Sequence, residues 1–530
     1  MKIAQKITVV ALLWLIFVNP GTITSIDTVR RLSMSHAWWT GEEEGFSGNK
    51  IIININGKNY IPYDLGQSML MLPGDWLGEK LGQGLKNEKE REHFREAIVG
   101  FLIFVPINLL MVLTCLRFLQ LLNYREKVAG LSSIVLLIGT SVLFYSSFHQ
   151  QNNQILLFVL VSYQMALAYA IKGKKSLAIL SGAALGFAFI IRITSILYIA
   201  SLLTFLIGCV VSRDKINPLS SGLRSFLLWM SGFMPMVLLE RALNYVRYGS
   251  WSATTVSLHL QVYANAPALV ELDAVVEGAN TGFSFFKLLT KVQPEALFAP
   301  FFSPEKSIFL YDPLVLPCFI LLIVCWKFLA QDIKWYAIAT TIGFLLHLYL
   351  YSWTSEWILH AEWGARYHIT SVHLWLVPLI PLLVRGAIKQ IDRSKNLERK
   401  TLTWSARVII IVAIAIQLSS ITLDGAVEAY QQRLGIGSSL RIAQRFKNIS
   451  YLLGGSSPSD FDFLQVEVPP ETAILQKKIE AKTGWNILPF LYQNKLDSDS
   501  WLNKLIPLLT VVWSLIFILA VTSTVWIFIK

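Results

Sequence analysis

The sequence predicts an all-α polytopic membrane protein with about 12 transmembrane helices. Of its 530 residues, 54% are hydrophobic and 15% are charged, whereas soluble domains carry roughly 25% charged residues. A bilayer core about 30 Å thick needs roughly 20 apolar residues for each helical span, and stretches of this kind recur along the chain. Composition therefore places the chain among membrane proteins, and no nucleotide or nucleic-acid motif competes with this interpretation.

The apolar stretches give the predicted spans in order. After a basic start, the apolar run from Ile7 has no convincing small-x-small cleavage site before Asp27, so we expect a retained first helix. Residues 176–211 are too long for one span and are interrupted at Arg192, so we split them into two short helices. The further spans are predicted at 97–122, 128–148, 153–171, 176–191, 193–211, 225–246, 311–329, 335–352, 368–385, 405–422 and 506–529.

Basic loops orient these spans. With the N-terminus in the cytoplasm, every short basic loop falls on the cytoplasmic side, as the positive-inside rule requires. These loops contain Arg125 and Lys127; Lys172, Lys174 and Lys175; Arg213, Lys215 and Arg224; Lys327 and Lys334; and the cluster from Arg385 to Arg407. Topology thus explains the formal charge of +12, and we expect no nucleic-acid partner.

The long connections then face outward, at about 24–96, 247–308, 353–367 and 423–505, and we expect the functional site there. We divide the chain into a membrane core at 1–422, an external subdomain at 423–505 and a C-terminal transmembrane helix at 506–530.

The four cysteines, Cys115, Cys209, Cys318 and Cys325, lie in apolar stretches without a CxxC pair. We therefore expect neither a disulfide framework nor a zinc site.

Residues 25–39 follow the first span and predict a short interfacial helix, apolar on one side and basic on another. Asp27 stands at its beginning. One interpretation is a helix cap, since aspartate is a favoured N-cap and is stabilised by the helix dipole. The functional interpretation is a general base that takes a proton from an acceptor hydroxyl.

Four arginines are candidates for binding a phosphate. A guanidinium can hold two phosphate oxygens at once and stabilise charge that develops on a leaving group. Arg192 should lie at a helix end or face a cavity, because a charge at the bilayer centre costs about 2.5 to 3.5 kcal/mol; the alternative is a buried ion pair. Arg366 has the alternative role of an interfacial anchor. Arg30 and Arg31 meet either the same phosphate or ordinary anionic lipid.

Other polar and aromatic residues near the outer surface are weaker candidates. Asp64, beside Tyr63, is a candidate for acceptor binding or simply a turn former. His149 closes a polar cluster and is either a sugar-binding residue or part of an external turn. The acids Glu42, Glu43 and Glu44 read as a solvated turn or as a cation or sugar site. Trp353, Trp357, Trp363 and Trp375 are candidates for sugar stacking or for an interfacial aromatic belt.

Several segments resemble, in order, the bacterial relatives of protein O-mannosyltransferases and lipid A aminoarabinose transferases of the GT-C glycosyltransferase superfamily. The likeness covers about residues 5–385. It runs through Asp27; Tyr60-Ile-Pro-Tyr-Asp64-Leu-Gly66-Gln67-Ser68 with Pro73; Gly182-Ala-Ala-Leu-Gly186 leading to Arg192; Asn244-Tyr-Val-Arg-Tyr248-Gly249; Phe302-Ser303-Pro304-Glu-Lys306 with Tyr311-Asp312-Pro313; and Trp363-Gly364-Ala-Arg366-Tyr367.

The resemblance implies a transferase of the bacterial inner membrane that takes a sugar from a polyprenyl-phosphate carrier at the periplasmic or extracellular face. The acceptor is a lipid, a glycan or a protein. By the resemblance Asp27 is the catalytic base, and Tyr63, Asp64, His149 and Tyr367 are candidates for acceptor or sugar binding. Many relatives have a second acid beside the base, where this chain has Thr28. The sequence requires no cofactor, and a divalent metal is unsupported.

Our hypothesis is an inverting single displacement, with Arg192 and Arg366 holding the donor phosphate. Two alternatives stay open. An O-antigen ligase or polymerase also uses a polyprenyl-linked donor and typically has a large late external loop, as at 423–505. A secondary transporter has its site near the midplane on broken helices and often has inverted repeats, whereas this chain has no matching halves.

Overall fold

The computed structural model describes most of the chain. Its described residues are 3–42, 53–55, 57–85, 87–214, 216–255, 257–258, 292–353, 362–388, 397–424, 427–433, 438–454, 484–489 and 504–529. These residues are helical apart from turns and one antiparallel hairpin, in which β1 (Ile53–Ile55) pairs with β2 (Lys58–Tyr60). The chain is thus an all-α polytopic membrane protein, as predicted.

Each of the twelve predicted spans coincides with an apolar helix or helix pair. In the described residues, seven helices are long and apolar enough to cross a membrane, and up to nine if each of two bent pairs is one span. Three apolar helices are shorter: α1 (Ile3–Val18), α9 (Lys175–Ile191) and α17 (Val315–Cys325) with the 3₁₀ turn after it. That all twelve cross the bilayer stays a prediction.

The remaining long helices follow the predicted order. They are α4 (Glu88–Val99), which continues through a π-turn into α5 (Val105–Leu121); α8 (Asn152–Lys172); α10 (Tyr198–Val211); α11 (Pro218–Tyr248); α18 (Gln331–Tyr351); α22 (Leu397–Thr422); and α27 (Ile506–Ile529). The short outer elements are α2 (Ile26–Thr40), α3 (Leu65–Gly82), α15 (Pro294–Phe302), α16 (Ile308–Tyr311), α23 (Val427–Arg433) and α24 (Arg441–Leu453).

Two predicted spans are wrong as single helices. The span at 128–148 breaks into α6 (Glu126–Ile138) and α7 (Val142–Phe148), bent by 55°. The span at 368–385 breaks into α20 (Ile369–Leu376) and α21 (Ile380–Ala387), bent by 52°. Each break has a local cause: Asp312 accepts hydrogen bonds from the main chain and hydroxyl of Ser141 at the first, and Pro378 interrupts the second.

The predicted split at Arg192 is confirmed. Helix α9 ends at Ile191, and Arg192 is extended, with φ −155° and ψ 120°, before a 3₁₀ turn leads into α10. The guanidinium therefore extends from a helix end, which is the placement expected for a charge in an apolar stretch.

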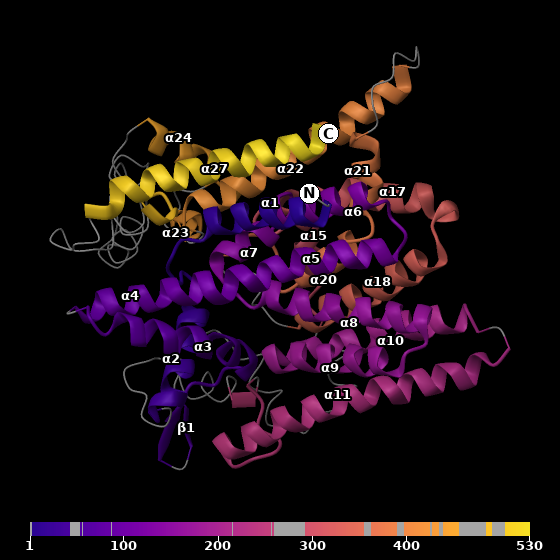
Figure 1. The fold of residues 1–530 in the computed structure, drawn as a ribbon, viewed down its shortest axis with the longest axis horizontal. Helices are drawn as coiled ribbons and strands as arrows, with labels where there is room; N and C mark the ends of the chain where they lie inside the picture. The colour runs from indigo at the N-terminus through magenta and orange to yellow at the C-terminus, as the bar shows by residue number, and fades with distance from the viewer. Residues whose placement is uncertain are drawn as a thin grey trace.

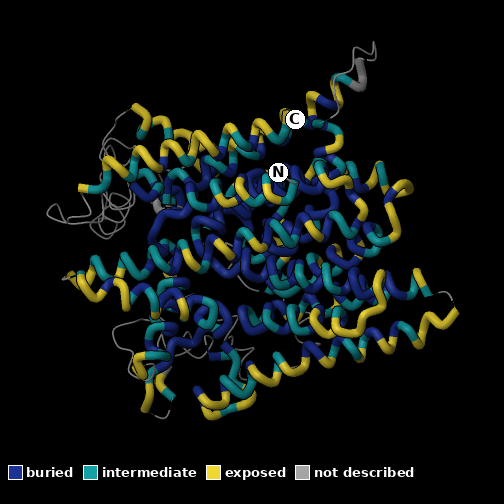
Figure 2. The backbone as a smooth tube through the Cα atoms, in the orientation of Figure 1, coloured by how far each residue is buried: buried dark blue, intermediate teal, exposed yellow. Residues whose placement is uncertain are grey.

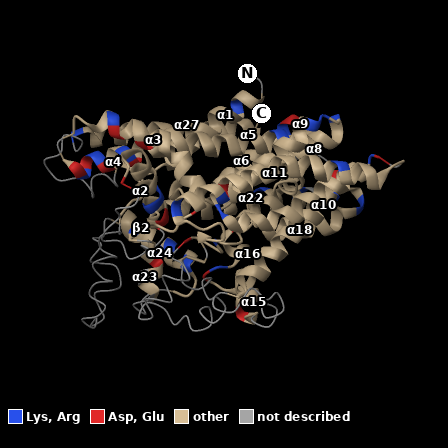
Figure 3. Ribbon diagram, turned by 90° about the horizontal axis from the view of Figure 1, so that it is seen from below, with Lys and Arg blue, Asp and Glu red and all other residues tan. Residues whose placement is uncertain are grey.

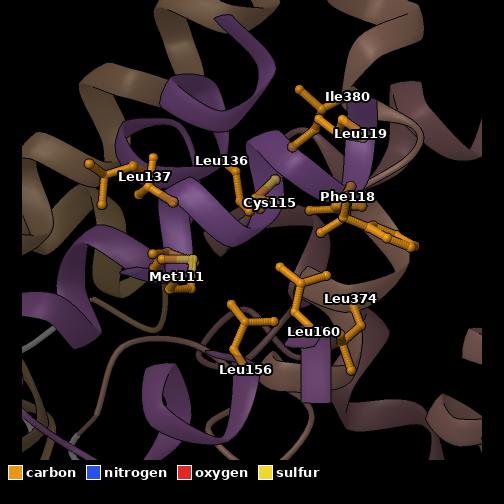
Figure 4. Close-up of a cluster of buried hydrophobic side chains, with 14 of the residues drawn as sticks. Met111, Cys115, Phe118, Leu119, Leu136, Leu137, Leu156, Leu160, Leu374 and Ile380 are labelled. Carbon is orange, nitrogen blue, oxygen red and sulfur yellow. The ribbon is translucent and has the colours of Figure 1, made fainter. Parts of the chain in front are cut away.

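The core is a continuous apolar cluster among the central helices. Figure 4 shows leucine, phenylalanine and methionine side chains of α5, α6, α8, α20 and α21 meeting there. Figure 2 shows exposed residues along peripheral helices such as α11 and α27, and many of these residues are large and apolar. A helix with an apolar outer face is suited to lipid rather than water.

Helices α9 and α11 pack with unusually close backbones. A Cβ on Gly182 would lie 2.0 Å from the carbonyl oxygen of Trp229, and one on Gly232 would lie 1.9 Å from that of Ile179. Small residues permit such an approach between membrane helices. The Gly182-to-Gly186 motif therefore has a packing role that positions the end of α9, and with it Arg192.

The two ends of the long helices differ in their charged residues and in the elements that lie beside them. Lys172 ends α8 and Lys175 begins α9 at one end, where Arg213 also pairs with Asp332 at 2.7 Å. In Figure 1 the connection between α10 and α11 lies at the right-hand end, whereas β1, α23 and α24 lie at the left. Figure 3 shows the long helices largely free of charge between their ends. The helices thus have a basic end and an opposite end that carries the short elements.

Helix α27 packs along α1, as the yellow and indigo ribbons of Figure 1 show. The indole of Trp14 donates to the hydroxyl of Thr524 at 2.9 Å, and that of Trp513 donates to the carbonyl of Phe17 at 3.2 Å. The two helices therefore run antiparallel, and α1 leads directly into α2.

Candidate functional site

Asp27 lies in the first turn of α2, where Tyr63 and Arg366 reach it. Its Oδ1 accepts a hydrogen bond from the Tyr63 hydroxyl at 2.8 Å, and its Oδ2 accepts one from Nη2 of Arg366 at 2.6 Å. The N-cap of α2 is Ser25, so the interpretation of Asp27 as the cap is wrong. The carboxylate instead accepts hydrogen bonds from side chains of two distant segments.

Helix α2 is fixed by bonds to its neighbours on both sides. The Thr28 hydroxyl and the amide of Gln67 both donate to the carbonyl of His149, at 3.1 and 2.8 Å. Farther along α2, the indole of Trp39 donates to Asp75 of α3 at 2.7 Å. Thr28 therefore anchors α2 to the turn after α7.

Arg366 lies in the turn before α20 and bridges two carboxylates. Its Nη1 donates to Oε1 of Glu362 at 2.7 Å while its Nη2 binds Asp27, and the side chain is 11% exposed. Burial alone lowers the pKa of Arg366. The charges of Glu362 and Asp27 together raise it by more than burial lowers it, so the pKa lies above the usual value. The alternative role as a snorkelling anchor is wrong, because the guanidinium is buried and paired.

Arg31 is a buried cation that no carboxylate among the described residues hydrogen-bonds. It is 5% exposed, and its guanidinium lies 4.4 Å from the ring centroid of Tyr63. Within the described ranges, no side chain or carbonyl forms a hydrogen bond with that guanidinium, and its buried Nε has no acceptor. Burial lowers the pKa of Arg31, partly offset by the nearby charge of Asp27. A buried charge without hydrogen-bond acceptors is costly, so this position favours an anionic ligand.

Arg30 binds the same tyrosine. Its Nη1 donates to the Tyr63 hydroxyl at 3.1 Å, and that hydroxyl in turn donates to Asp27. Burial and the charge of Asp27 raise the pKa of Tyr63 to about 12, so the hydroxyl keeps its proton at neutral pH. Tyr63 therefore acts as a hydrogen-bond relay between Arg30 and Asp27.

Arg192 meets Arg366 across one aromatic ring. The guanidinium carbons of Arg192 and Arg366 lie 4.9 and 5.5 Å from the ring centroid of Tyr367, which also stacks on Tyr351. In the described part of the chain, Arg192 has no carboxylate partner, contrary to the ion-pair alternative. Arg192 is thus a second cation without an internal counter-ion.

The first external loop lies directly on the end of α9. A Cβ on Gly66 would lie 2.6 Å from the backbone nitrogen of Ile191, so only glycine permits this approach. Asp64, the residue that caps α3, accepts from the hydroxyl of Thr255 at 2.6 Å. The loop that carries Tyr63 and Asp64 is therefore held beside Arg192.

The electrostatics keep Asp27 ionised. Burial alone raises the pKa of Asp27, but the charges of Arg366 and Arg31, with the hydrogen bonds from Arg366 and Tyr63, hold it well below the usual range of an aspartate. Cations also exceed anions here: Arg30, Arg31, Arg192 and Arg366 surround Asp27 and Glu362. The site is suited to an anion.

Two residues of the site were missed by the sequence analysis as functional candidates. Glu362 holds Arg366 and also accepts from the amide of Gln150 at 3.1 Å. Lys306, 3% exposed, donates from Nζ to the carbonyl of Glu362 at 3.3 Å. The signal for Lys306 was its place in the Phe302-to-Lys306 motif, whereas Glu362 had no signal.

The other candidates lie elsewhere. The ring of His149 is 1% exposed and packs on Phe104, with centroids 4.6 Å apart, and burial lowers its pKa to about 3. Glu42 is exposed, whereas Glu43, Glu44 and Trp357 lie outside the described residues. Trp363 is buried and contacts Arg445 of α24, so it is not part of an exposed belt, whereas Trp375 is half-buried and packs on Phe319.

The described residues contain no group of three or more histidine, cysteine or acidic side chains placed to hold a metal ion. The groups that the site does contain are a carboxylate, a protonated phenol and several arginines. Such a set binds an anion and can accept a proton from a neighbouring hydroxyl.

Comparisons with known proteins give a weak likeness to solved structures. No family model matches the chain, and no curated protein is significantly similar to it in sequence. The fold is similar to the crystal structure of ArnT from Cupriavidus metallidurans bound to undecaprenyl phosphate, with 12% sequence identity and a TM-score of 0.41. The likeness covers 84% of this chain and 75% of that chain. At this TM-score it identifies neither a family nor a substrate.

Proposed function

We propose that the protein is an integral-membrane glycosyltransferase that moves a sugar from a polyprenyl-phosphate carrier to an acceptor hydroxyl at the outer face of the bacterial inner membrane. The site sits at the end of the helices opposite the basic loops. If those loops face the cytoplasm, as the positive-inside rule requires, the site faces outward.

One observation carries the proposal. Asp27 and Arg366 are in direct contact, and Arg31 lies buried beside them with no hydrogen bond to its guanidinium from the described residues. This arrangement supplies a base and a phosphate-binding group at one point, as transfer from a sugar phosphate requires. The motif resemblance from Asp27 to Arg366 supports the same reaction class independently of the geometry.

The proposed step is a single displacement with inversion. Asp27 takes the proton of the acceptor hydroxyl, whose oxygen forms a bond to the anomeric carbon of the sugar. The bond between that carbon and the phosphate oxygen breaks, and polyprenyl phosphate leaves with the electron pair. Arg366, Arg31 and Arg192 stabilise the charge that grows on the leaving phosphate, so no general acid is needed.

Phosphate binding also prepares the base. In the structure Arg366 donates to Asp27, which lowers the basicity of the carboxylate. A donor phosphate competes for the same guanidinium, because arginine binds phosphate in a two-pronged manner. Asp27 then loses a counter-ion and becomes a stronger base when the donor is present. Tyr63, Asp64 and Tyr367 are assigned to the acceptor or the sugar.

The test is sugar transfer from a panel of radiolabelled polyprenyl-phosphate sugars by purified protein reconstituted in lipid. Asp27→Asn should reduce transfer at least about 100-fold, the lower end of what a general base contributes. The matched control is Asp332→Asn, which removes a carboxylate paired with Arg213 at the opposite end of the helices. This control should keep full transfer.

Each other outcome points elsewhere. Full transfer by Asp27→Asn would refute Asp27 as the base. Transfer that requires residues 423–505 but not Asp27 would favour a ligase or polymerase. Solute uptake by vesicles without any lipid-linked sugar would favour a transporter.

A further inference from the structure

Helix α24, in the segment expected to be a separate external subdomain, carries a fully buried arginine. Arg445 is 0% exposed and donates to Glu428 at 2.6 Å and to the carbonyl of Leu423 at 2.8 Å. Glu428 also accepts from Asn448 at 3.1 Å. Arg445 therefore ties α24 to α23 and to the end of α22.

Arg445 also touches the turn that carries Arg366. Its guanidinium lies 5.5 Å from the ring centroid of Trp363, which is 3% exposed. Trp363 packs edge-on against Tyr311 at 4.9 Å, and its carbonyl accepts from the hydroxyl of Tyr145 at 3.2 Å. Trp363 is the neighbour of Glu362, so the conformation of this turn sets where Glu362 and Arg366 lie.

A second contact of α24 reaches the other side of Glu362. Nη2 of Arg441 lies 3.3 Å from Oε2 of Glu305, and its Nε donates to Gln432 at 2.9 Å. The next residue, Lys306, donates to the carbonyl of Glu362. One helix thus contacts both segments that flank Glu362, through Arg445 on Trp363 and through Arg441 on Glu305.

We propose that α24 belongs to the active site, with Arg445 and Arg441 as positioning residues that hold the 362–366 turn and so place the guanidinium of Arg366. The role of Arg366 in phosphate binding rests on the proposed function, whereas the restraint on the turn does not. The described part of this segment, residues 423–424, 427–433 and 438–454, is then a wall of the site rather than an appended domain.

Two variants release the turn without leaving a buried charge alone. Arg441→Gln removes the pair with Glu305, which is 36% exposed and can be solvated. Arg445→Met combined with Glu428→Gln removes both members of the buried pair, since removing one alone is strongly destabilising. The control is Lys447→Gln, which removes a cation from the exposed face of the same helix.

The first measurement needs no ligand. Hydrogen–deuterium exchange of the 362–368 amides in lipid nanodiscs should be faster in both variants than in wild type and Lys447→Gln, because local opening governs exchange. Exchange at the first turns of α11, at the opposite end of the helices, should not change. Unchanged exchange at 362–368 would overturn the proposal even if the wild type binds its donor.

The second measurement separates positioning from general destabilisation. Arg441→Gln should raise the Kd for polyprenyl phosphate by at least about fivefold, the lower end of usual coupling between sites. In an Arg366→Gln background the same change should alter Kd by less than about twofold, because non-additivity marks action through a shared residue.

If Arg441→Gln raised the Kd equally in the wild-type and Arg366→Gln backgrounds, Arg441 would not act through Arg366, and the proposal would be overturned. A wild type that binds no polyprenyl phosphate would refute the proposed function, and the exchange measurement would then decide the role of α24 by itself.

Discussion

Arg366 and Asp27, 339 residues apart in sequence, meet at 2.6 Å between Nη2 and Oδ2. The contact joins the first interfacial helix to the turn before α20 and holds the candidate base against a candidate phosphate ligand. In the structure, each of these two side chains is the hydrogen-bond partner of the other. A donor phosphate that binds Arg366 would separate them.

Arg31→Met should weaken phosphate binding without destabilising the ligand-free protein. The guanidinium of Arg31 is buried and makes no hydrogen bond within the described ranges, so its removal relieves a desolvation cost. We expect an equal or higher unfolding temperature and a Kd for polyprenyl phosphate raised at least tenfold, or about 1.4 kcal/mol. Arg30→Met, which removes only a bond to Tyr63, is the comparison. A lower unfolding temperature with unchanged Kd would assign Arg31 to structure.

Lys306 should make stability depend on pH in the alkaline range. Burial lowers the pKa of Lys306 from 10.5 to about 7. Between these values the unfolded chain binds more protons than the folded one, so the contribution of this residue to stability rises with pH. Relative to Lys306→Met, the wild type should gain unfolding temperature from about pH 7 to about pH 10 and show a constant difference below that range.

Lys172→Met, at the opposite end of the helices, controls for the general loss of a lysine. A difference between wild type and Lys306→Met that stays constant across the alkaline range would show that Lys306 is charged in the folded protein.

Asp312→Ala should destabilise the broken span formed by α6 and α7. The carboxylate accepts from the main chain of Ser141 at 2.6 Å and from its hydroxyl at 2.7 Å, and all these groups are buried. The main-chain donor left without an acceptor costs about 1–3 kcal/mol, whereas the hydroxyl keeps His373 at 3.0 Å, so we still expect a lower unfolding temperature in detergent. Asp214→Ala removes a comparable cap in an exposed turn and should have little effect.

Gly182→Ala should separate α9 from α11. The new methyl group would lie 2.0 Å from the carbonyl oxygen of Trp229, well inside contact distance. Overpacking of this kind typically costs about 1–3 kcal/mol, and it would also move Arg192 at the end of α9. Gly84→Ala, whose Cβ would meet nothing within 4 Å, is the control. Equal thermal stability of the two variants would contradict the close helix contact.

The apolar segments could be predicted because each needs only a run of hydrophobic residues, and the break at Arg192 because a charge cannot lie inside one. The breaks at Ser141 and Pro378 were missed for different reasons. Ser141 lies in a polar Gly-Thr-Ser segment, and the acceptor of its hydrogen bonds, Asp312, is 171 residues away in sequence. Pro378 is visible in the sequence, but the run around it is otherwise apolar.

Part of the candidate site could be predicted because a charged residue stands out beside an apolar run. Asp27, Arg192 and Arg366 are charged residues beside apolar spans, so sequence alone marked them as exceptional. Their contacts with Tyr63 and Tyr367 depend on how distant loops fold together. Glu362 and Arg445 carried no local signal, because an acid in an external loop and an arginine in an amphipathic helix are ordinary until tertiary packing buries them.

The pairing of α1 with α27 constrains how the protein is made. Trp14 is synthesised 510 residues before Thr524, its hydrogen-bond partner. During synthesis the face of α1 that meets α27 must therefore stay uncovered while the intervening helices are made. Helix α1 also packs on α5 and α6, but this last face is covered only when α27 arrives, so packing around the helix that leads into Asp27 should be completed late, and a ribosome stalled before α27 should leave a chain that is inserted but immature.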